Sequence, residues 1–470
     1  MTNKYIFPCF ALCACLLAGC LSEKHRFSFN ENGKFKIAQF TDIHWVHGSP
    51  TTARSIESIK AVLAIEKPDL AILTGDLVYR VPAKEPWTEL ANIFDEAKIP
   101  FTVALGNHDR ESCPNEEIFE ILSRSPYFVG EKGPKDITGT GNFVLQVYDR
   151  ANKPAALIYC LDSNKGPVYF DQIAWYRKQS DKYTADNNGK PLPAVAFFHI
   201  PVPEYFNVLD KKTTIGIHRE KPCPPDHNTG LLGSFYEKKD VMGVFVGHEH
   251  LNDYIGIELG IALAYGRVSG WEAYGDLERG ARIIELYENE FVFDTWISTP
   301  LGVEQIFNYP TTISSIDEET MTYLPAKNVK PTKQGVSYTY YEGKFASVRN
   351  IHPDNIVSQG VMKDISILDA ATDNFFAYEF RSLIKIPEKA VYNFYVISDY
   401  DSQIYINDQL IADKTGGSTA LLEEKVALEA GYHEMKVLYY QHRGRRMLEI
   451  GYSSKNIRRQ KLPDEIFFVE

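Results

Sequence analysis

The segment FTVALGNHDR, residues 101–110, runs from an apolar stretch straight into a turn of polar side chains. Its first five residues have the composition of a buried β-strand, and the glycine that follows them permits a tight turn. Asn107, His108 and Asp109 then stand where such a strand ends. Ligands of open α/β sheets bind at the carboxyl ends of the strands, so the segment predicts a strand and part of a functional site together.

Further apolar runs lead into polar residues in the same way, at 35–40, 70–74, 194–198 and 241–246. The polar residues that follow them are Asp42, His44, Asp76, His199, His248 and His250. Helical candidates lie between the runs, at 52–65, 87–97, 116–123 and 172–183. Alternation of strands and helices favours a layered α/β fold. Because the runs are apolar nearly throughout, we expect both faces of the sheet to be covered.

The polar residues at the strand ends offer oxygen and nitrogen ligands and no thiolates, which suits Mn, Fe, Zn or Mg. Together with Asn107 they exceed the needs of one ion. Two ions about 3.5–4 Å apart can hold a phosphoryl group and activate a water molecule. Each motif alone is a weak signal, since a lone histidine after an apolar strand is more often a core residue than a ligand. Their joint occurrence, each closing a strand, favours a dinuclear metal centre.

The ordered set Asp-x-His, Gly-Asp, Gly-Asn-His-Asp, His and Gly-His-x-His resembles the signature of the calcineurin-like metallophosphoesterases. Leu161-Asp162-Ser163, Asn228-Thr229-Gly230 and the run 247–253 are similar to one branch of them, the purple-acid-phosphatase-like phosphoesterases of plants and fungi. The resemblance covers about residues 34–290. It implies an α/β layered metallophosphoesterase fold, with a β-sandwich core flanked by helices.

The resemblance also implies a role for each residue. Asp42, His44 and His250 would hold one metal ion, Asn107, His199 and His248 would hold the other, and Asp76 would bridge them. The ions would be divalent or a mixed-valence pair. His108 would protonate the leaving oxygen or stabilise its developing charge, and Asp109 would orient the His108 ring. A metal-bound hydroxide would attack phosphorus, with no covalent enzyme intermediate.

Tyr79 marks a departure from the family pattern. Purple acid phosphatases use a tyrosinate ligand in a Gly-Asp-x-x-Tyr motif, and Tyr79 stands at that spacing after Asp76. Those enzymes usually lack a histidine where His44 stands, so we expect His44 to be the ligand and Tyr79 to pack beside the site. Arg110 and His47 are candidates for contacting phosphate oxygens. For both, a solvated loop side chain is the alternative.

Residues 334–460 resemble the lectin-like β-sandwich domain first named from anthrax protective antigen. Alternating runs at 391–397 and 434–440, with a tight-turn candidate at Asn407-Asp408, predict an all-β sandwich. Residues 301–333 are rich in Thr, Ser, Pro and Asn and predict a linker to the preceding domain, 34–300.

Domains of this lectin-like type often bind carbohydrate, sometimes through Ca²⁺ held by two adjacent aspartates. Here Tyr400 separates Asp399 from Asp401, which puts a calcium site in doubt. Carbohydrate is a candidate partner of this domain, and a purely structural role is the alternative.

The first 20 residues predict a signal peptide with a short apolar core. It ends in Leu17-Ala18-Gly19-Cys20, which looks like a bacterial lipobox. We therefore expect lipid on Cys20, a tether over 21–33, and a membrane-anchored lipoprotein of the bacterial cell envelope, periplasmic or surface-exposed. Ordinary secretion or an uncleaved anchor is the alternative.

The formal net charge of -12 argues against a nucleic-acid partner. Cys160 lies in an apolar run and is expected to be buried, and Cys113 with Cys223 is a candidate disulfide. The sequence as a whole predicts an exported, metal-dependent hydrolase of phosphate mono- or diesters. The alternative is a catalytically idle, glycan-binding or adhesion lipoprotein. The complete ligand set argues against that alternative, because a retired site usually loses ligands.

Overall fold

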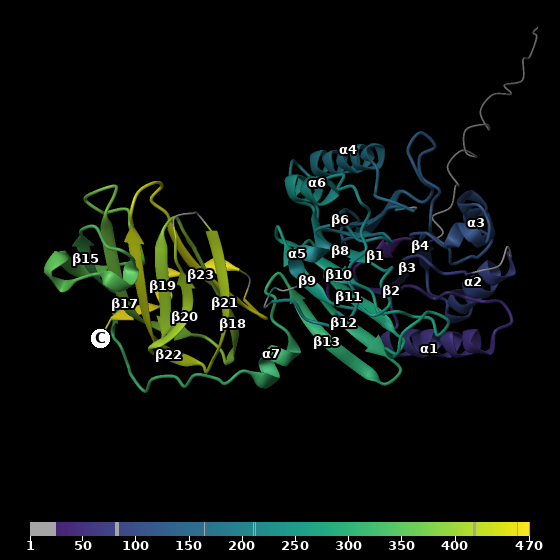
Figure 1. Ribbon diagram of the computed structural model, residues 1–470. Coiled ribbons are helices and arrows are strands. Elements are labelled where there is room, and N and C mark those ends of the chain that lie inside the picture. The colour runs from purple at the N-terminus through teal and green to yellow at the C-terminus, as the bar shows by residue number, and fades with distance from the viewer. Residues whose placement is uncertain are drawn as a thin grey trace, which may run out of the picture.

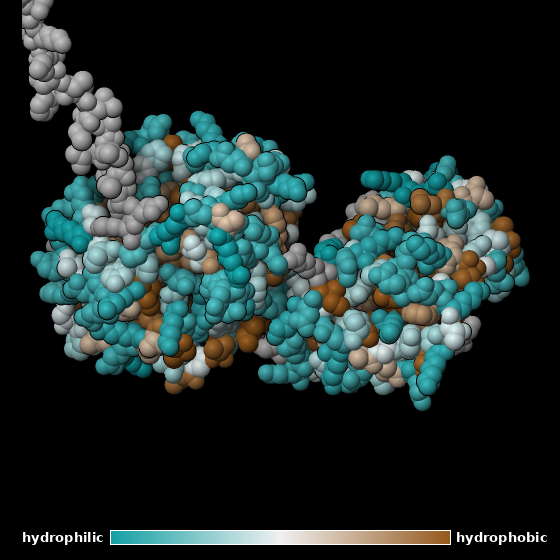
Figure 2. Space-filling view, turned by 180° about the vertical axis from the view of Figure 1, so that it is seen from behind, coloured by the Kyte–Doolittle hydropathy of each residue, from teal (hydrophilic) through white to brown (hydrophobic). Residues whose placement is uncertain are grey.

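The computed structural model describes residues 25–79, 84–163, 165–209, 211, 213–416, 420–457 and 459–469. The predicted signal peptide, the Cys20 anchor and the first part of the predicted tether lie outside these residues. The described chain forms an N-terminal domain and an all-β C-terminal domain, with helix α7 (Ser315–Thr320) between them (Figure 1). Seen from behind, both surfaces are largely hydrophilic and a narrow waist separates them (Figure 2). No helix among the described residues is long and apolar enough to cross a membrane.

Two sheets make up the core of the N-terminal domain. The first has the order β1-β5-β6-β7-β8-β10-β9, with bounds β1 (Phe27–Ser28), β5 (Phe143–Tyr148), β6 (Pro154–Cys160), β7 (Ala194–Phe197), β8 (Val241–Val246), β9 (Ile255–Glu258) and β10 (Ile261–Tyr265). The second has the order β13-β12-β11-β2-β3-β4, with bounds β2 (Lys34–Phe40), β3 (Leu70–Leu73), β4 (Phe101–Val103), β11 (Ala281–Tyr287), β12 (Phe293–Thr299) and β13 (Gly302–Tyr309). Strands β6, β7, β8 and β10 are parallel, as are β2, β3 and β4, so their carboxyl ends gather along one edge of each sheet.

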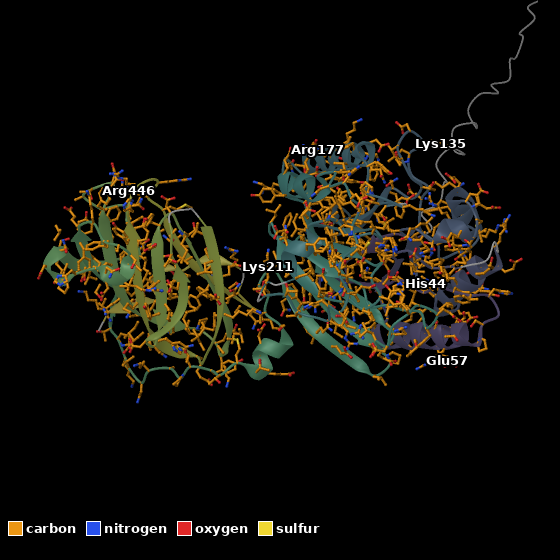
Figure 3. The ribbon with its side chains drawn as sticks, in the orientation of Figure 1. His44, Glu57, Lys135, Arg177, Lys211 and Arg446 are labelled. Carbon is orange, nitrogen blue, oxygen red and sulfur yellow. The ribbon has the colours of Figure 1, made fainter. Side chains whose placement is uncertain are left out.

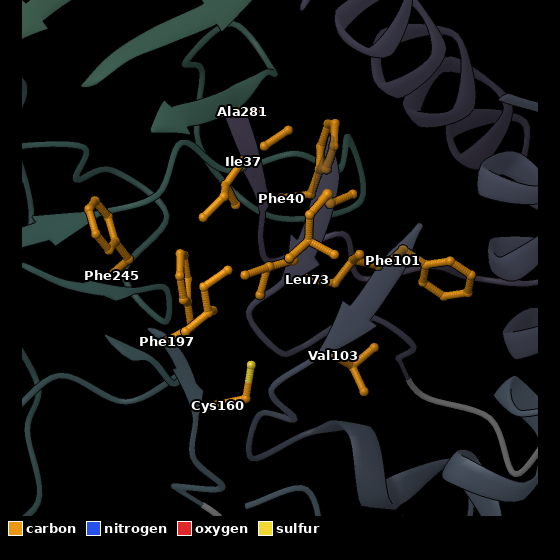
Figure 4. Close-up of a cluster of buried hydrophobic side chains, with 14 of the residues drawn as sticks. Ile37, Phe40, Leu73, Phe101, Val103, Cys160, Phe197, Phe245 and Ala281 are labelled. Atoms are coloured by element: carbon orange, nitrogen blue, oxygen red, sulfur yellow. The ribbon is translucent and has the colours of Figure 1, made fainter. Parts of the chain in front are cut away.

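The two sheets pack face to face, and helices flank them. Ile37, Phe40 and Leu73 of the second sheet share one buried cluster with Phe197 and Phe245 of the first (Figure 4). The helices are α1 (Pro50–Glu66), α2 (Glu85–Ala97) and α3 (Asn115–Leu122) beside the second sheet, and α4 (Phe170–Asp186), α5 (Tyr205–Val208) and α6 (Leu231–Lys238) beside the first. This confirms the predicted layered α/β fold with a sandwich core, in which both faces of the parallel strands are covered.

The sheets extend beyond the predicted domain limits at both ends. Strand β13 falls within the predicted linker 301–333, yet it pairs with β12. Its exposed residues mix polar and apolar types because it is an edge strand, so it lacks a clear sequence period. Strand β1 falls within the predicted tether 21–33, yet it pairs with β5, and its residue Phe27 and the following Phe29 are buried.

The C-terminal domain is the predicted β-sandwich. One sheet has the order β14-β25-β17-β22-β19-β20, in which β15 also pairs with β17 and β16 pairs with β15, and the other has the order β21-β18-β23-β24. The strand bounds are β14 (Lys333–Gln334), β15 (Val336–Glu342), β16 (Ile356–Met362), β17 (Phe376–Ile386), β18 (Ala390–Ser398), β19 (Asp401–Ile406), β20 (Gln409–Lys414), β21 (Ala420–Leu428), β22 (Gly431–Gln441), β23 (Leu448–Ser454), β24 (Gln460–Lys461) and β25 (Phe467–Val469). Asn407 and Asp408 join β19 to β20 with φ values of 47° and 63°, the left-handed conformation of a tight hairpin turn.

Asp401 in the C-terminal domain is buried and bound to backbone. Its Oδ1 accepts a hydrogen bond from Gly416 N at 2.8 Å, and its Oδ2 accepts one from Val348 N at 3.2 Å. Both carboxylate oxygens therefore hold loops of the sandwich together. This aspartate has a structural role that needs no calcium.

The two domains are joined by more than a covalent link. Ile313, in the segment before α7, forms a buried cluster with Val391 and Ala427 of the C-terminal domain. Lys425 of β21 donates a hydrogen bond to Asp317 of α7 at 2.6 Å. The segment around α7 therefore packs on the four-stranded sheet as part of one interface.

Candidate metal centre

Every predicted metal ligand follows a parallel strand of one of the two sheets. Asp42 and His44 follow β2, Asp76 follows β3, Asn107 follows β4, His199 follows β7, and His248 and His250 follow β8. Asp42, His44, Asp76 and His248 have positive φ angles, between 50° and 85°. Residues other than glycine seldom adopt this left-handed conformation, and such residues cluster at functional sites. Figure 3 shows His44 within the N-terminal domain, on the side away from the C-terminal domain.

The structure brings these side chains together in two groups. Asp42, His44 and His250 form one, and Asp76, His199 and His248 form the other; within each, the candidate ligand atoms lie within 4.8 Å of one another. Asp76 Oδ2 lies 3.1 Å from His199 Nε2 in its own group and 4.0 Å from His44 Nε2 in the other. Asp76 thus stands between the two groups, where a bridging carboxylate would have to be.

Several buried polar atoms of the site have no hydrogen-bond partner. They are His44 Nε2, His250 Nδ1 and Asn107 Oδ1. Buried polar atoms are nearly always paired, because leaving one unpaired costs about 1–3 kcal/mol. Cations held between the two groups would satisfy these lone pairs. The donor set therefore fits the pair of metal ions that the sequence predicts.

The electrostatics keep the donors in the forms that bind metal. Burial lowers the pKa of His44 and of His248 to about 4, so both rings are neutral at neutral pH. Burial alone would raise the pKa of Asp42 and of Asp76, but the neighbouring histidines hold both pKa values below the usual range. Neutral imidazoles and ionised carboxylates are the ligand forms. His199 is the exception, because burial alone would lower its pKa but the Asp76 carboxylate raises it to about 10, so an ion that binds there displaces a proton from this ring.

Buried contacts orient the donors. His199 Nδ1 lies 2.8 Å from the Thr74 carbonyl oxygen, which leaves Nε2 for the site. Thr41 Oγ1 donates a hydrogen bond to Asp42 Oδ2 at 2.8 Å. The Gly247 backbone lies directly against Thr41. Only glycine fits there, since a Cβ at position 247 would lie 2.0 Å from Thr41 Oγ1.

The predicted role of Asp109 is wrong. Its buried carboxylate accepts hydrogen bonds from the backbone amides of Asp76, Leu77, Val78 and Gly106, at 2.6–3.2 Å. Burial, together with the nearby Asp76 charge, raises the pKa of Asp109 to about 6, so the group is mostly ionised at neutral pH. Asp109 therefore fixes the backbone of the loops after β3 and β4 rather than the ring of the residue before it.

Glu111 orients the His108 ring instead. Its Oε1 lies 2.9 Å from His108 Nδ1. The family motif does not include Glu111, but its spacing from His108 is a signal in the sequence. Residues three apart in a helical turn share one face, and Asp109–Glu111 form a 3₁₀ turn.

Tyr79 lies beside the site, as predicted for a packing role. Its ring meets the His44 ring edge-on at 4.8 Å and the His108 ring edge-on at 5.2 Å between centroids. His44 lies in one group with Asp42 and His250, so it is placed as a candidate ligand.

The structure does not bring the two predicted phosphate-contacting residues to the metal donors. His47 pairs with Glu89 at 3.0 Å, and both side chains are substantially exposed. Arg110 is exposed and lines a hollow with Asn115 and Lys132, to which no metal donor contributes. The alternative for both residues, a solvated loop side chain, describes them better.

Two hollows open at the donor groups and share His108, Cys223 and His248. The wide hollow, about 580 Å³, is also lined by Asn107, Lys165, Tyr169, Asp226 and His227. The acidic hollow, about 410 Å³, is also lined by Tyr79, Glu220, Glu249, Glu272 and Tyr274. The residues from 220 to 227 in these walls come from one loop between β7 and β8, outside the strand-end motifs.

The three cysteines within the described residues are free. Cys160 is fully buried, as predicted. Cys113 is buried and Cys223 is exposed, so the candidate disulfide between them is not formed in the structure.

Known proteins match both parts of the chain. The calcineurin-like phosphoesterase family matches residues 35–252, and the PA14 domain matches residues 332–465. "Probable inactive purple acid phosphatase 29" of Arabidopsis thaliana is 31% identical over 59% of this chain and 84% of that protein. "Phosphatase DCR2" of Saccharomyces cerevisiae is 29% identical over 63% of this chain and 59% of that protein. A solved dimetal phosphatase from Danio rerio covers 58% of this chain and 98% of its own, with 11% identity and a TM-score of 0.41.

Proposed function

Because this chain belongs to the calcineurin-like phosphoesterases and carries a PA14 domain, we propose that it hydrolyses phosphate esters at a dinuclear metal centre. The observation that carries the proposal is the pair of donor groups on either side of Asp76, with their unpartnered buried lone pairs. Some relatives are named as inactive, which makes an idle scaffold the rival function. The complete donor set supports an active enzyme.

Asp42, His44 and His250 would hold one ion, Asn107, His199 and His248 would hold the other, and Asp76 would be shared between them. Mn, Fe, Zn and Mg suit these oxygen and nitrogen donors. Two such ions, when bound, polarise the phosphoryl oxygens and lower the pKa of a water molecule so that a nucleophile is available near neutral pH.

The protein's own residues handle the leaving group. His108 lines both hollows and lies next to the donors, so it is placed to protonate the leaving oxygen. Glu111 Oε1 accepts a hydrogen bond from Nδ1–H of the His108 ring. The proton on Nε2 of the same ring is then the one available for transfer. In the reaction, a water oxygen bonds to phosphorus, the bond from phosphorus to the ester oxygen breaks, and the released alcohol takes its proton from His108. The proton that the water loses passes to solvent, and His108 regains a proton from solvent before the next turnover.

The place of action follows from the leader sequence. The lipobox ending at Cys20 supports export and lipid anchoring in the bacterial envelope, periplasmic or surface-exposed. The PA14 domain adds carbohydrate as a proposed second partner. Cys20→Ser should move the protein from the membrane fraction to the soluble fraction, and unchanged membrane attachment would contradict the anchor.

The test of the enzymatic proposal uses the full chain carrying Cys20→Ser, loaded with Mn, Fe or Zn. Hydrolysis of p-nitrophenyl phosphate is measured beside that of bis(p-nitrophenyl) phosphate. Activity that is lost in Asn107→Ala and in His108→Ala would support the proposal. A folded protein that binds about two ions and cleaves neither ester would contradict it.

A further inference from the structure

We propose that the substrate is a phosphodiester and that the ester group lying in the acidic hollow carries an ammonium group. This inference rests on the proposed phosphoesterase function and names its substrate class. It comes from the two hollows, their shared wall and the different charges that line them.

A phosphoryl group bound at the metal donors would have one hollow on each of two sides. Both include His108 and His248, and the acidic hollow also includes His44, Asp76 and His250. Their volumes of about 580 and 410 Å³ each lie in the range of small-molecule pockets. A monoester carries one organic group and fills one hollow. A diester carries two and fills both.

Carboxylates dominate the acidic hollow. Glu220, Glu249 and Glu272 line it, and within the described part of the chain none of them forms an ion pair with a lysine or arginine. Lys221 also lines the hollow, but its ammonium lies over the Phe206 ring, 5.5 Å from the ring centre. Glu220 and Glu272 therefore keep negative charge on the wall of the hollow, which a cationic substituent would neutralise.

Glu249 supplies an independent sign of a missing partner. Its side chain is 4% exposed, and its Oε2 has no hydrogen-bond partner in the structure, whereas Oε1 accepts from Cys223 N at 2.9 Å. A buried carboxylate oxygen without a partner is costly. An ammonium group in the hollow would relieve that cost.

Aromatic rings complete the hollow. Tyr274 stacks on His250 with 4.0 Å between ring centres, and its hydroxyl donates to Glu220. Tyr79 lines the same space. Ring faces beside carboxylates attract alkylammonium groups through cation–π contacts, which contribute about 0.5–2 kcal/mol.

The charge of the phosphate favours the same class. A phosphate monoester carries about 1.5 to 2 negative charges near pH 7, and a diester carries one. Glu220 and Glu272 offset part of the positive charge of bound ions, which reduces the advantage of the more highly charged monoester. Hydrolysis proceeds as above: phosphorus gains one oxygen from water and loses one alcohol, and the product monoester keeps the other group.

The test compares two substrates of the same shape on the metal-loaded full chain. They are p-nitrophenyl phosphorylcholine and p-nitrophenyl 3,3-dimethylbutyl phosphate, in which carbon replaces the charged nitrogen. We expect the choline ester to have a KM about tenfold lower. Glu220→Gln and Glu272→Gln should each narrow this ratio to about threefold or less. Asp226→Asn, in the wide hollow, is the matched control and should leave the ratio unchanged.

Calorimetric titration with phosphocholine and with 3,3-dimethylbutyl phosphate gives a second readout that needs no turnover. Tighter binding of phosphocholine, weakened by Glu220→Gln, would support the proposal. Equal KM values and equal affinities for the charged and neutral members of each pair would overturn it. Cleavage of p-nitrophenyl phosphate without cleavage of either diester would overturn this inference alone. Failure to cleave any of the three esters would instead overturn the proposed function.

Discussion

The backbone amide of Asp76 donates a hydrogen bond to the Asp109 carboxylate at 3.0 Å. The same carboxylate accepts from Gly106 N at 2.7 Å and from Leu77 N at 2.6 Å. One buried side chain thus holds both the loop that presents Asp76 and the turn that presents Asn107. The spacing of these two candidate ligands is set by a residue that is not a ligand.

Asp109→Asn should loosen this arrangement. Asparagine has one acceptor oxygen and one donor nitrogen, so at least one backbone amide would lose its partner. We expect the free energy of unfolding to fall by about 1–3 kcal/mol and the metal affinity to fall with it. Urea unfolding and titration with metal would measure both. Full stability and metal affinity with a reduced kcat would contradict this role and restore the ring-orienting one.

Glu111→Gln should act on catalysis and spare the metal centre. The substitution replaces a charge-assisted hydrogen bond to His108 with a neutral one, and bonds to charged groups contribute about 1.5–3 kcal/mol. We expect kcat to fall by about tenfold, with an altered pH profile and an unchanged metal content. His108→Ala, the reference variant, should lose about 10²–10⁴-fold. A Glu111→Gln enzyme with the wild-type kcat and pH profile would contradict the assignment.

Metal analysis should find about two ions per chain. His44→Ala removes a donor from one group only, so it should retain about one ion. Asp76→Asn affects both groups, and we expect it to weaken both ions. Elemental analysis after dialysis measures the content of each variant. A wild-type protein that retains no metal would support an idle scaffold.

Tyr79→Phe should change neither the visible spectrum nor the activity by much. Because the Tyr79 ring packs on His44 and His108, we expect an iron-loaded protein without a strong visible tyrosinate band, and kcat within about threefold of wild type. Absorption spectra of both proteins decide the matter. A visible band that disappears in the variant would make Tyr79 a ligand.

Calcium should not stabilise the C-terminal domain. Both oxygens of Asp401 accept hydrogen bonds from backbone amides, so we expect the melting temperature to be the same with millimolar CaCl₂ and with a chelator. Asp401→Ala should lower the free energy of unfolding by about 1–3 kcal/mol, because it leaves the amides of Val348 and Gly416 unpaired. Calcium-dependent melting of the wild type would refute this view.

The sequence predicted those features that local pattern determines. Apolar runs ending in polar residues predicted the parallel strands. Because the carboxyl ends of parallel strands lie at the same edge of a sheet, the strands alone also predicted that these polar residues would meet. The edge strand β13 was missed because half of it faces solvent. The role of Asp109 was missed because a motif reports which residues occur and not which atoms they contact. The acidic hollow could not be predicted from the sequence. Glu220 and Glu272 are far apart in the chain and line the same hollow only after tertiary folding.

The contact between α7 and the four-stranded sheet has a consequence for the molecule at a surface. Ile313, Val391 and Ala427 are buried together, and Ser314 pairs with Phe307 of β13, so the segment before α7 contacts both domains. A polysaccharide or cell wall that captured this domain would fix the direction in which the metal cleft points. On the proposed function, capture would then restrict hydrolysis to esters that approach from one side.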